Sequence, residues 1–155
     1  MPARETLVPV LLEKVYHLIE TKIDDDQSPL VLKLAKHLFS NISHDDLLQR
    51  NESDLYGAIV SIWKHLSDTP NAQPSVKVFN PTVAHHGWKS THTIVEIVMP
   101  DQPFLVDSIK MCLARLDITS HLMLHGPTVI QYEEGAITDI DKSSQGFKHS
   151  IFHIE

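Results

Sequence analysis

The segment HTIVEIVMPDQPFLVDSIKMCLARL, residues 92–116, changes from one hydrophobic period to another across a short loop. Residues 92–98 are rich in β-branched side chains and predict a strand. Residues 104–116 place apolar side chains at helical spacing and predict a helix. The apolar stripe of that helix consists of Leu105, Ile109, Cys112, Leu113 and Leu116. A strand, a loop and a helix therefore follow one another here.

More β-rich stretches lie downstream of this unit. Residues 119–124 predict a strand, residues 128–140 predict a hairpin that turns at Glu134-Gly135, and residues 150–155 predict a last strand. The resulting β-α-β-β order is three quarters of a ferredoxin-like β-α-β-β-α-β unit. Because no final turn or cap follows the last strand, we expect the sequence to be a piece of a longer polypeptide.

The residues upstream predict helices instead. Three helices are expected, and each carries one narrow apolar stripe that has to pack on the other helices or on the following domain. We expect Ser28 to cap the second helix, with Pro29 at its first position. Asn51 or Ser53 is expected to cap the third helix, whose stripe consists of Leu55, Ile59, Ile62, Trp63 and Leu66.

The period changes from 3.6 toward 2 after the stretch SDTPNAQP, residues 67–74, which is the predicted linker. Residues 76–79 predict a short strand just beyond it. The expected fold class is therefore α+β. A helical region occupies residues 1–70, and an incomplete ferredoxin-like β-α-β-β module occupies residues 71–155.

Composition excludes several classes of protein. The 155 residues carry a formal net charge of −7 and 42% hydrophobic side chains, as in a soluble globular domain. This charge would repel a nucleic-acid backbone. No uninterrupted apolar run approaches the roughly 20 residues that a membrane span needs. We expect a cytoplasmic protein that binds neither nucleic acid nor membrane, with Cys112 as a buried, inert thiol.

Local catalytic motifs are missing from the sequence. The five glycines are too scattered for a dinucleotide fingerprint or a P-loop, and GxSxG, HExxH and CxxC do not occur. The 11 histidines are the one excess. His121 and His125 on one strand would lie about 13 Å apart, too far to chelate one ion alone. We therefore interpret the histidines as scattered surface residues or hydrogen-bonded residues, and not as the ligands of one metal ion. We expect no catalytic, cofactor-binding or metal-ligating residue in this segment.

Three polar residues remain near the start of the 104–116 helix: Asp101, Asp107 and Ser108. No His, Lys or Cys lies at a spacing that would make it a base partner for these residues, which disfavours catalysis. In the structural interpretation, Asp101 caps the helix and Asp107 complements its positive end. In the functional interpretation, the helix start contacts a ligand.

Residues 76–127 closely resemble the N-terminal region of the large-subunit, bacterial-type NAD-specific glutamate dehydrogenases. The matching elements are Phe79-Asn80-Pro81, Gly87-Trp88 with Ser90, His92 and Thr93, Pro103 through Ser108, and His121 through His125. Residues 125–127, HGP, depart from the family pattern, in which His directly precedes Pro, so that Gly126 resembles an insertion. Trp88 is expected to anchor its loop on the sheet.

The resemblance implies a parent enzyme that oxidises L-glutamate to 2-oxoglutarate and ammonium with NAD. It also implies that this segment is the first of several ACT-like modules before a distant catalytic region. The catalytic lysines, the aspartate and the Rossmann domain of the family have no counterparts here, so this segment alone should not catalyse and holds no NAD.

Effectors of ACT-like modules tend to sit beside the loop from the first strand into the first helix, which is residues 99–108 here. Helix N–H groups suit an effector carboxylate, and Asp101 or Asp107 would suit its ammonium. Together with Ser108, these residues are the candidate effector-binding site.

Three interpretations of function remain open. The segment is a regulatory or assembly module of a glutamate dehydrogenase, a purely structural module without a ligand, or a free-standing amino-acid sensor. The expected partners are the rest of the subunit, an amino-acid effector and a second copy of the chain. A second copy is expected because an incomplete module leaves a strand edge and an apolar face open. Residues 76–79 could fill the edge, and the N-terminal helices could cover the face.

Overall fold

The computed structural model describes residues 4–69, 73–140 and 146–155. Helices dominate the first part of the chain: α1 (Arg4–Lys22), α2 (Ser28–Phe39), α3 (His44–Leu48) and α4 (Glu52–Ser67). The second part contains β1 (Ser75–Phe79), α5 (Val83–His86), β2 (Ile94–Pro100), α6 (Leu105–Arg115), β3 (Met123–Glu133), β4 (Ala136–Ile140) and β5 (Phe147–Ile154). The α+β class predicted from the sequence is confirmed. Residues 70–72 of the predicted linker lie outside the described residues.

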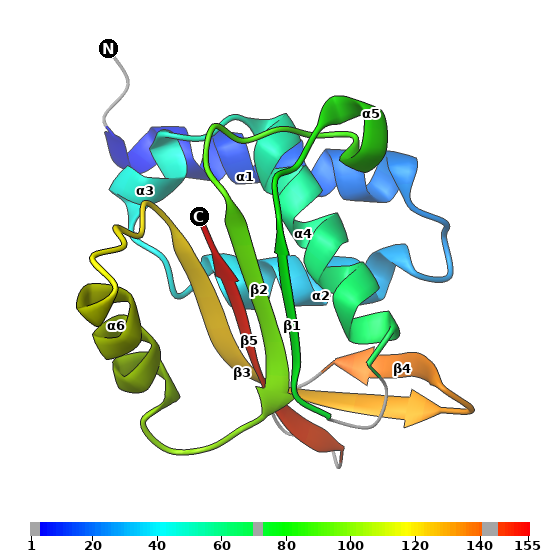
Figure 1. The fold of residues 1–155 in the computed structure, drawn as a ribbon. Helices are drawn as coiled ribbons and strands as arrows, with labels where there is room; N and C mark the ends of the chain where they lie inside the picture. The colour runs from blue at the N-terminus through cyan, green and yellow to red at the C-terminus, as the bar shows by residue number, and fades with distance from the viewer. Residues whose placement is uncertain (1–3, 70–72, 141–145) are drawn as a thin grey trace.

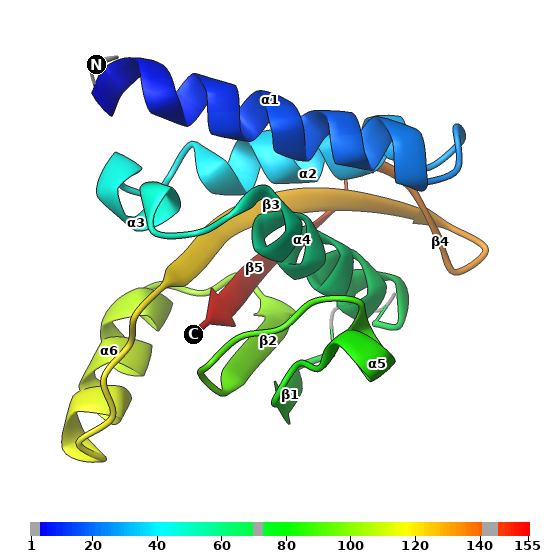
Figure 2. The same cartoon turned by 90° about the horizontal axis from the view of Figure 1, so that it is seen from above.

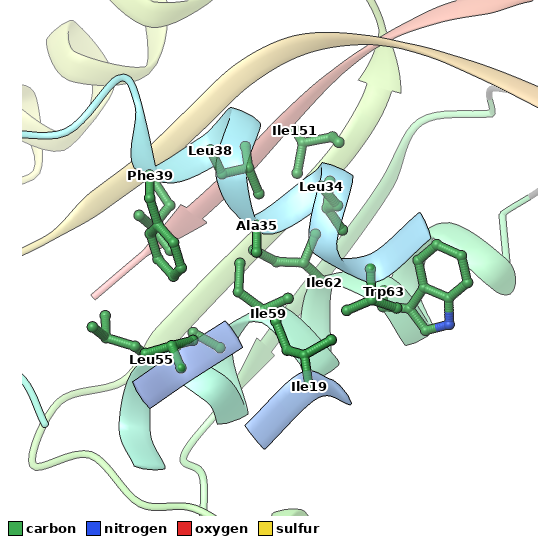
Figure 3. Close-up of a cluster of buried hydrophobic side chains, with 14 of the residues drawn as sticks. Ile19, Leu34, Ala35, Leu38, Phe39, Leu55, Ile59, Ile62, Trp63 and Ile151 are labelled. Carbon is green, nitrogen blue, oxygen red and sulfur yellow. The ribbon is translucent and has the colours of Figure 1, made fainter. Parts of the chain in front are cut away.

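The stripes predicted for the three long N-terminal helices form the core. Val15 and Ile19 of α1, Leu34 and Leu38 of α2, and the α4 stripe are buried. Figure 3 shows Ile19, Leu34 and Leu38 converging with side chains of α4 and with Ile151 of β5. One cluster of apolar side chains thus runs from the helices into the sheet, and burial of this cluster is the main driving force for the fold. The predicted boundary near residue 70 stays a prediction.

Local hydrogen bonds determine where the helices begin. The Asn51 side chain accepts a hydrogen bond from the Asp54 N–H at 2.8 Å, which confirms Asn51 as the cap of α4. The prediction for Ser28 is wrong, because Gln27 is the cap residue and Ser28 is already helical. Helix α3 was not predicted; it begins where the Ser43 hydroxyl accepts a hydrogen bond from the Asp46 N–H at 3.2 Å.

The strands form one sheet in the order β1-β2-β5-β3-β4, and each pair of neighbours is antiparallel (Figure 1). Strands β2 and β3 are therefore parallel and are separated by β5, which is the split β-α-β arrangement of a ferredoxin-like unit. Strand β1 pairs with the free side of β2. The prediction that residues 76–79 could fill this edge is confirmed.

Strand β3 is longer than the sequence predicted. The expected strand at 119–124 and the first half of the expected hairpin form one continuous strand that passes through Gly126 and Pro127. Gly126 pairs with Ile151 in unbroken register, and the irregularity of β3 lies further on, between Gln131 and Tyr132. The predicted turn at Glu134-Gly135 is confirmed, and both residues have positive φ, as a type I′ hairpin turn requires.

The helices cover the two faces of the sheet unequally. Figure 2 shows α1, α2 and α4 on one side of the strands and α6 on the other. Helices α2 and α4 contact the sheet, and α1 packs on the helices of that layer. The prediction that N-terminal helices could cover one face is therefore confirmed.

Helix α6 forms where it was predicted, but no residue of this fully described helix is buried. Leu116, just past its end, is 63% exposed, and Cys112 is exposed. The prediction of a buried thiol is wrong because no described residue covers this part of the apolar stripe. No helix in the described part of the chain is long and apolar enough to cross a membrane.

Candidate functional site

The loop that leads from β2 into α6 is fixed to β5 by Asp101. The Asp101 carboxylate accepts a hydrogen bond from the Ser150 hydroxyl at 2.6 Å and lies 3.2 Å from the Lys148 ammonium. The Asp101 N–H also donates to the Lys148 carbonyl at 2.9 Å. The Ser150 hydrogen bond and the neighbouring Lys148 charge hold the pKa of Asp101 below its usual range. Asp101 is therefore ionised and held in place at neutral pH.

Asp101 does not cap α6. The cap residue is Phe104, which has a left-handed backbone with φ of 65°. The structural interpretation of Asp101 is therefore wrong, because its carboxylate is bound by β5 and stands three residues before the cap. Asp107 lies in the first turn of α6, where a negative charge interacts favourably with the helix dipole.

A cavity of about 240 Å³ lies between this loop, the start of α6 and strands β3 and β5. Asp101 and Asp107 both line it, together with His125 and Ser150. Ser108 is not among the described residues that line this cavity. The structure thus brings together two of the three predicted site residues and leaves the third outside. We call this space the loop cavity.

The sequence analysis did not identify His125 and Ser150 as site residues. His125 pairs with Phe152, and its ring stacks on that side chain at a centroid distance of 5.4 Å. Burial, with the charges of Lys110 and His37, lowers the pKa of His125 from its ordinary value. Only the antiparallel register of β3 and β5 places these residues at the loop, and no local sequence signal carries that register.

The loop cavity has the groups that a small zwitterion needs. Two carboxylates can receive an ammonium group, and the first turn of α6 has N–H groups without helical partners. Its walls are partly apolar, from Phe104 and Phe152. This arrangement suits reversible binding.

A second polar cluster lies inside the molecule. Glu96 of β2 is 1% exposed, and its carboxylate accepts a hydrogen bond from His153 Nδ1 at 2.7 Å. His65 of α4 approaches the other carboxylate oxygen, at 3.4 Å from its Nδ1. Burial acts to raise the pKa of Glu96, but the hydrogen bond from His153 and the close approach of His65 outweigh it and lower the pKa to about 2.

This buried cluster joins α4, β2 and β5 through polar contacts. The one signal for it in the sequence is Glu96 itself, a carboxylate in a strand of β-branched residues, which must be paired if it is buried. His92 and His121 meet elsewhere, with rings stacked at 4.0 Å. No group of three His, Cys, Asp or Glu residues suited to a metal ion is found in the described part of the chain.

The family model described as "Glutamate dehydrogenase, ACT1 domain" matches residues 34–155. The chain belongs to this family. An NAD-specific glutamate dehydrogenase of Pseudomonas aeruginosa is 43% identical over 138 residues, which cover 86% of this chain and 8% of that protein. One of Halomonas elongata is 35% identical over 111 residues, which cover 72% of this chain and 7% of that protein.

The chain spans less than a tenth of the length of these curated relatives. No solved structure matches it. The glutamate dehydrogenase ACT1 match begins inside α2 and so includes α4, one of the two helices that pack on the sheet. The resemblance and the ACT-like architecture expected from the sequence are therefore confirmed.

Proposed function

We propose that this chain is the N-terminal regulatory and assembly segment of an NAD-dependent glutamate dehydrogenase. The complete enzyme would convert L-glutamate, NAD and water to 2-oxoglutarate, ammonium and NADH. The names of both relatives and their identity over most of this chain support that activity. The relatives are more than ten times as long as the matched stretch, which favours a module of a large subunit over a free-standing sensor.

The segment itself contributes regulation rather than chemistry. We infer that an amino-acid effector binds in the loop cavity. Its ammonium lies between Asp101 and Asp107, and its carboxylate lies at the first turn of α6. The observation that supports this role is the cavity itself, where the strand-to-helix loop of the module meets β3 and β5.

The melting temperature of the 155-residue chain tests the effector. An amino acid present at a hundredfold excess over its Kd stabilises the fold by about 2.7 kcal/mol, which is easily measured for a domain of this size. A survey of the common amino acids, each at the same ionic strength, should identify at least one that raises the melting temperature. No shift with any of them would favour the purely structural alternative.

Two substitutions one residue apart make this test specific. Asp107→Asn removes a carboxylate that lines the loop cavity and should abolish the ligand-induced shift, alone or combined with Ser108→Ala. Ser108→Ala alone should leave the shift intact, because Ser108 lies outside the described lining. Equal shifts in the wild type and in Asp107→Asn would remove the loop cavity from the proposal.

The catalytic part of the proposal needs a separate measurement. Reduction of NAD in the presence of L-glutamate should be detected for the full-length product of the gene. The purified 155-residue chain should show none above a heat-killed control. Turnover by the short chain would contradict the assignment of a non-catalytic segment.

The structural alternative also has an observation in its favour. Phe104 is 77% exposed and Met111 is 66% exposed, on the side of the sheet that the other helices do not cover. Large exposed apolar side chains mark interaction surfaces. An assembly role therefore does not depend on an effector, and the melting experiment separates the two.

A further inference from the structure

A second cavity, of about 400 Å³, lies between α4, β1 and α5, away from the loop cavity. Helix α4 contributes Gly57, Ser61 and Lys64, which recur on one face at helical spacing. Strand β1 contributes Lys77 and Phe79, alternate residues on the face turned toward the helices. Figure 1 shows β1 running beside α4 with α5 near one end. We call this space the lysine cavity.

Aromatic rings form the apolar part of its wall. Trp88 is 5% exposed and packs against Gly57, where an added Cβ would overlap the indole ring. Phe79 meets Trp88 edge-on at a centroid distance of 6.4 Å, and His86 stacks on Phe79 at 5.2 Å. These contacts fix the rings, so the cavity is formed before any ligand arrives.

The polar groups of this cavity are almost all donors or cations. Lys64, Lys77, His85 and His86 line it, and none of its described lining residues is acidic, in a chain whose net charge is −7. His86 Nδ1 accepts a hydrogen bond from the Thr82 N–H at 3.0 Å, so the neutral ring carries its proton on Nε2 and can donate from there.

Two carboxylates, Asp24 and Asp68, line a neighbouring cavity together with Lys64, but neither lines the lysine cavity itself. Asp68 lies 3.6 Å from the Lys77 ammonium, but both side chains are largely exposed, and such a pair contributes little. Glu96 is buried and is already paired with His153 and His65. Lys64 and Lys77 therefore remain available to an anion.

We propose that the lysine cavity binds a small dicarboxylate that has no ammonium group. Each carboxylate pairs with one lysine, and the short carbon chain between them lies against Phe79 and Trp88. An α-amino acid would bring an ammonium group among cations and donors with no lining carboxylate to receive it, and such an unpaired charge discriminates strongly against a ligand.

The physiological ligand rests on the proposed function. In a glutamate dehydrogenase, the dicarboxylate without an ammonium group is the product, 2-oxoglutarate, and the substrate is the matching amino acid. The lysine cavity then senses product, separately from the amino-acid effector of the loop cavity.

Calorimetric titration of the 155-residue chain at constant ionic strength tests the proposal without any variant. Glutarate and 2-oxoglutarate should bind saturably with one site, and L-glutamate and inorganic phosphate should bind at least about tenfold more weakly. No saturable binding at millimolar concentration, or binding of L-glutamate or phosphate as tight as that of glutarate, would overturn it.

A charge-matched pair of variants locates the site. Lys64→Gln with Lys77→Gln should weaken glutarate binding by about tenfold or more. Lys14→Gln with Lys110→Gln removes the same charge from exposed positions on α1 and α6 and should leave binding unchanged. Equal loss in both double variants would mean a nonspecific charge effect and would contradict the site.

The outcome is independent of the effector test. The loop cavity is probed by amino acids and by Asp107→Asn, and the lysine variants should leave that response intact. If the full-length protein failed to oxidise glutamate while glutarate still bound through Lys64 and Lys77, the site would stand and only its assignment to 2-oxoglutarate would fail.

Discussion

Glu96 is the residue whose charge matters most for the fold. It is buried in β2. The hydrogen bond from His153 and the close approach of His65 outweigh burial and lower its pKa to about 2, from an ordinary value of 4.5. A carboxylate with a lowered folded-state pKa stabilises the protein above its unfolded-state pKa, and this stability is lost as the pH falls through the folded value. Between these values the free energy of unfolding should therefore decrease by on the order of 3 kcal/mol through this residue.

Urea denaturation across that acidic range measures the effect. Glu96→Gln should lower stability near neutral pH, because the amide has one acceptor oxygen where the carboxylate has two, one facing each buried histidine. The variant should also flatten the acid dependence. Glu133→Gln, at an exposed carboxylate in β3, should keep the wild-type profile. Parallel profiles for Glu96→Gln and wild type would show that this carboxylate does not titrate with the lowered pKa.

Trp88 is a structural residue, and its packing on Gly57 can be measured. Trp88→Ala should lower the free energy of unfolding by about 3 kcal/mol, because the ring is buried. Gly57→Ala should cost about 1–3 kcal/mol in the wild type, since the new methyl group overlaps the ring. In the Trp88→Ala background the same change should be neutral or stabilising, because alanine favours the helix.

A double-mutant cycle by chemical denaturation gives the coupling directly. Additive losses would mean that Trp88 and Gly57 do not share one packing site. At this scale the sequence correctly predicted that Trp88 is a packing residue, because a large ring next to a glycine in a polar loop has few other roles. It gave no partner for Glu96, since His65 and His153 lie on different elements far along the chain.

Helix α6 shows the limit of periodicity at the scale of elements. The spacing of its apolar residues predicted the helix and its stripe, but periodicity says nothing about what lies opposite the stripe. The exposed position of Cys112 makes this testable. The thiol should react with a water-soluble thiol reagent in the native protein as fast as in urea, within about tenfold, and Cys112→Ser should not react. Protection until unfolding would mean that α6 is covered.

Strand β3 departs from prediction for a different reason. Gly and Pro usually interrupt strands, so residues 125–127 looked like a break. Pairing of β3 with β4 begins only at Ile130, so at Pro127 one side of β3 is a free edge and a missing N–H is tolerated there. Gly126 leaves room for His37 of α2, whose Nε2 lies 2.9 Å from the Pro127 carbonyl.

In the module as a whole, helices cover one face of the sheet, and β1 pairs with the edge that β2 would otherwise leave open. Strand β1 and the N-terminal helices, which the sequence offered as a possibility, provide that closure. The order of elements was enough to predict the ferredoxin-like core, because β-α-β-β units have few ways to fold. The sequence could not predict that α6 would leave its apolar side chains exposed, since that depends on which surfaces pack against the stripe, and the spacing of residues within the helix does not encode those surfaces.

The exposed surface predicts self-association of the isolated chain. Val76 of β1 is 61% exposed and Val78 is 64% exposed, on the same side of the sheet as α6. The outer edge of β1 also lacks a strand partner among the described residues. An apolar face next to an open edge invites pairing with a second copy, and light scattering should therefore detect a dimer.

A charge on the edge strand should prevent this pairing. Val76→Lys should give a monomer, because a lysine on an edge strand must be desolvated before another strand can pair there. Val10→Lys, at a 55% exposed position on the outer helix α1, adds the same charge away from the sheet and should leave the dimer intact. A clean monomer of the wild-type chain at high concentration, without dye binding to apolar surface, would show instead that the exposed valines and α6 are too little apolar surface to hold two copies together.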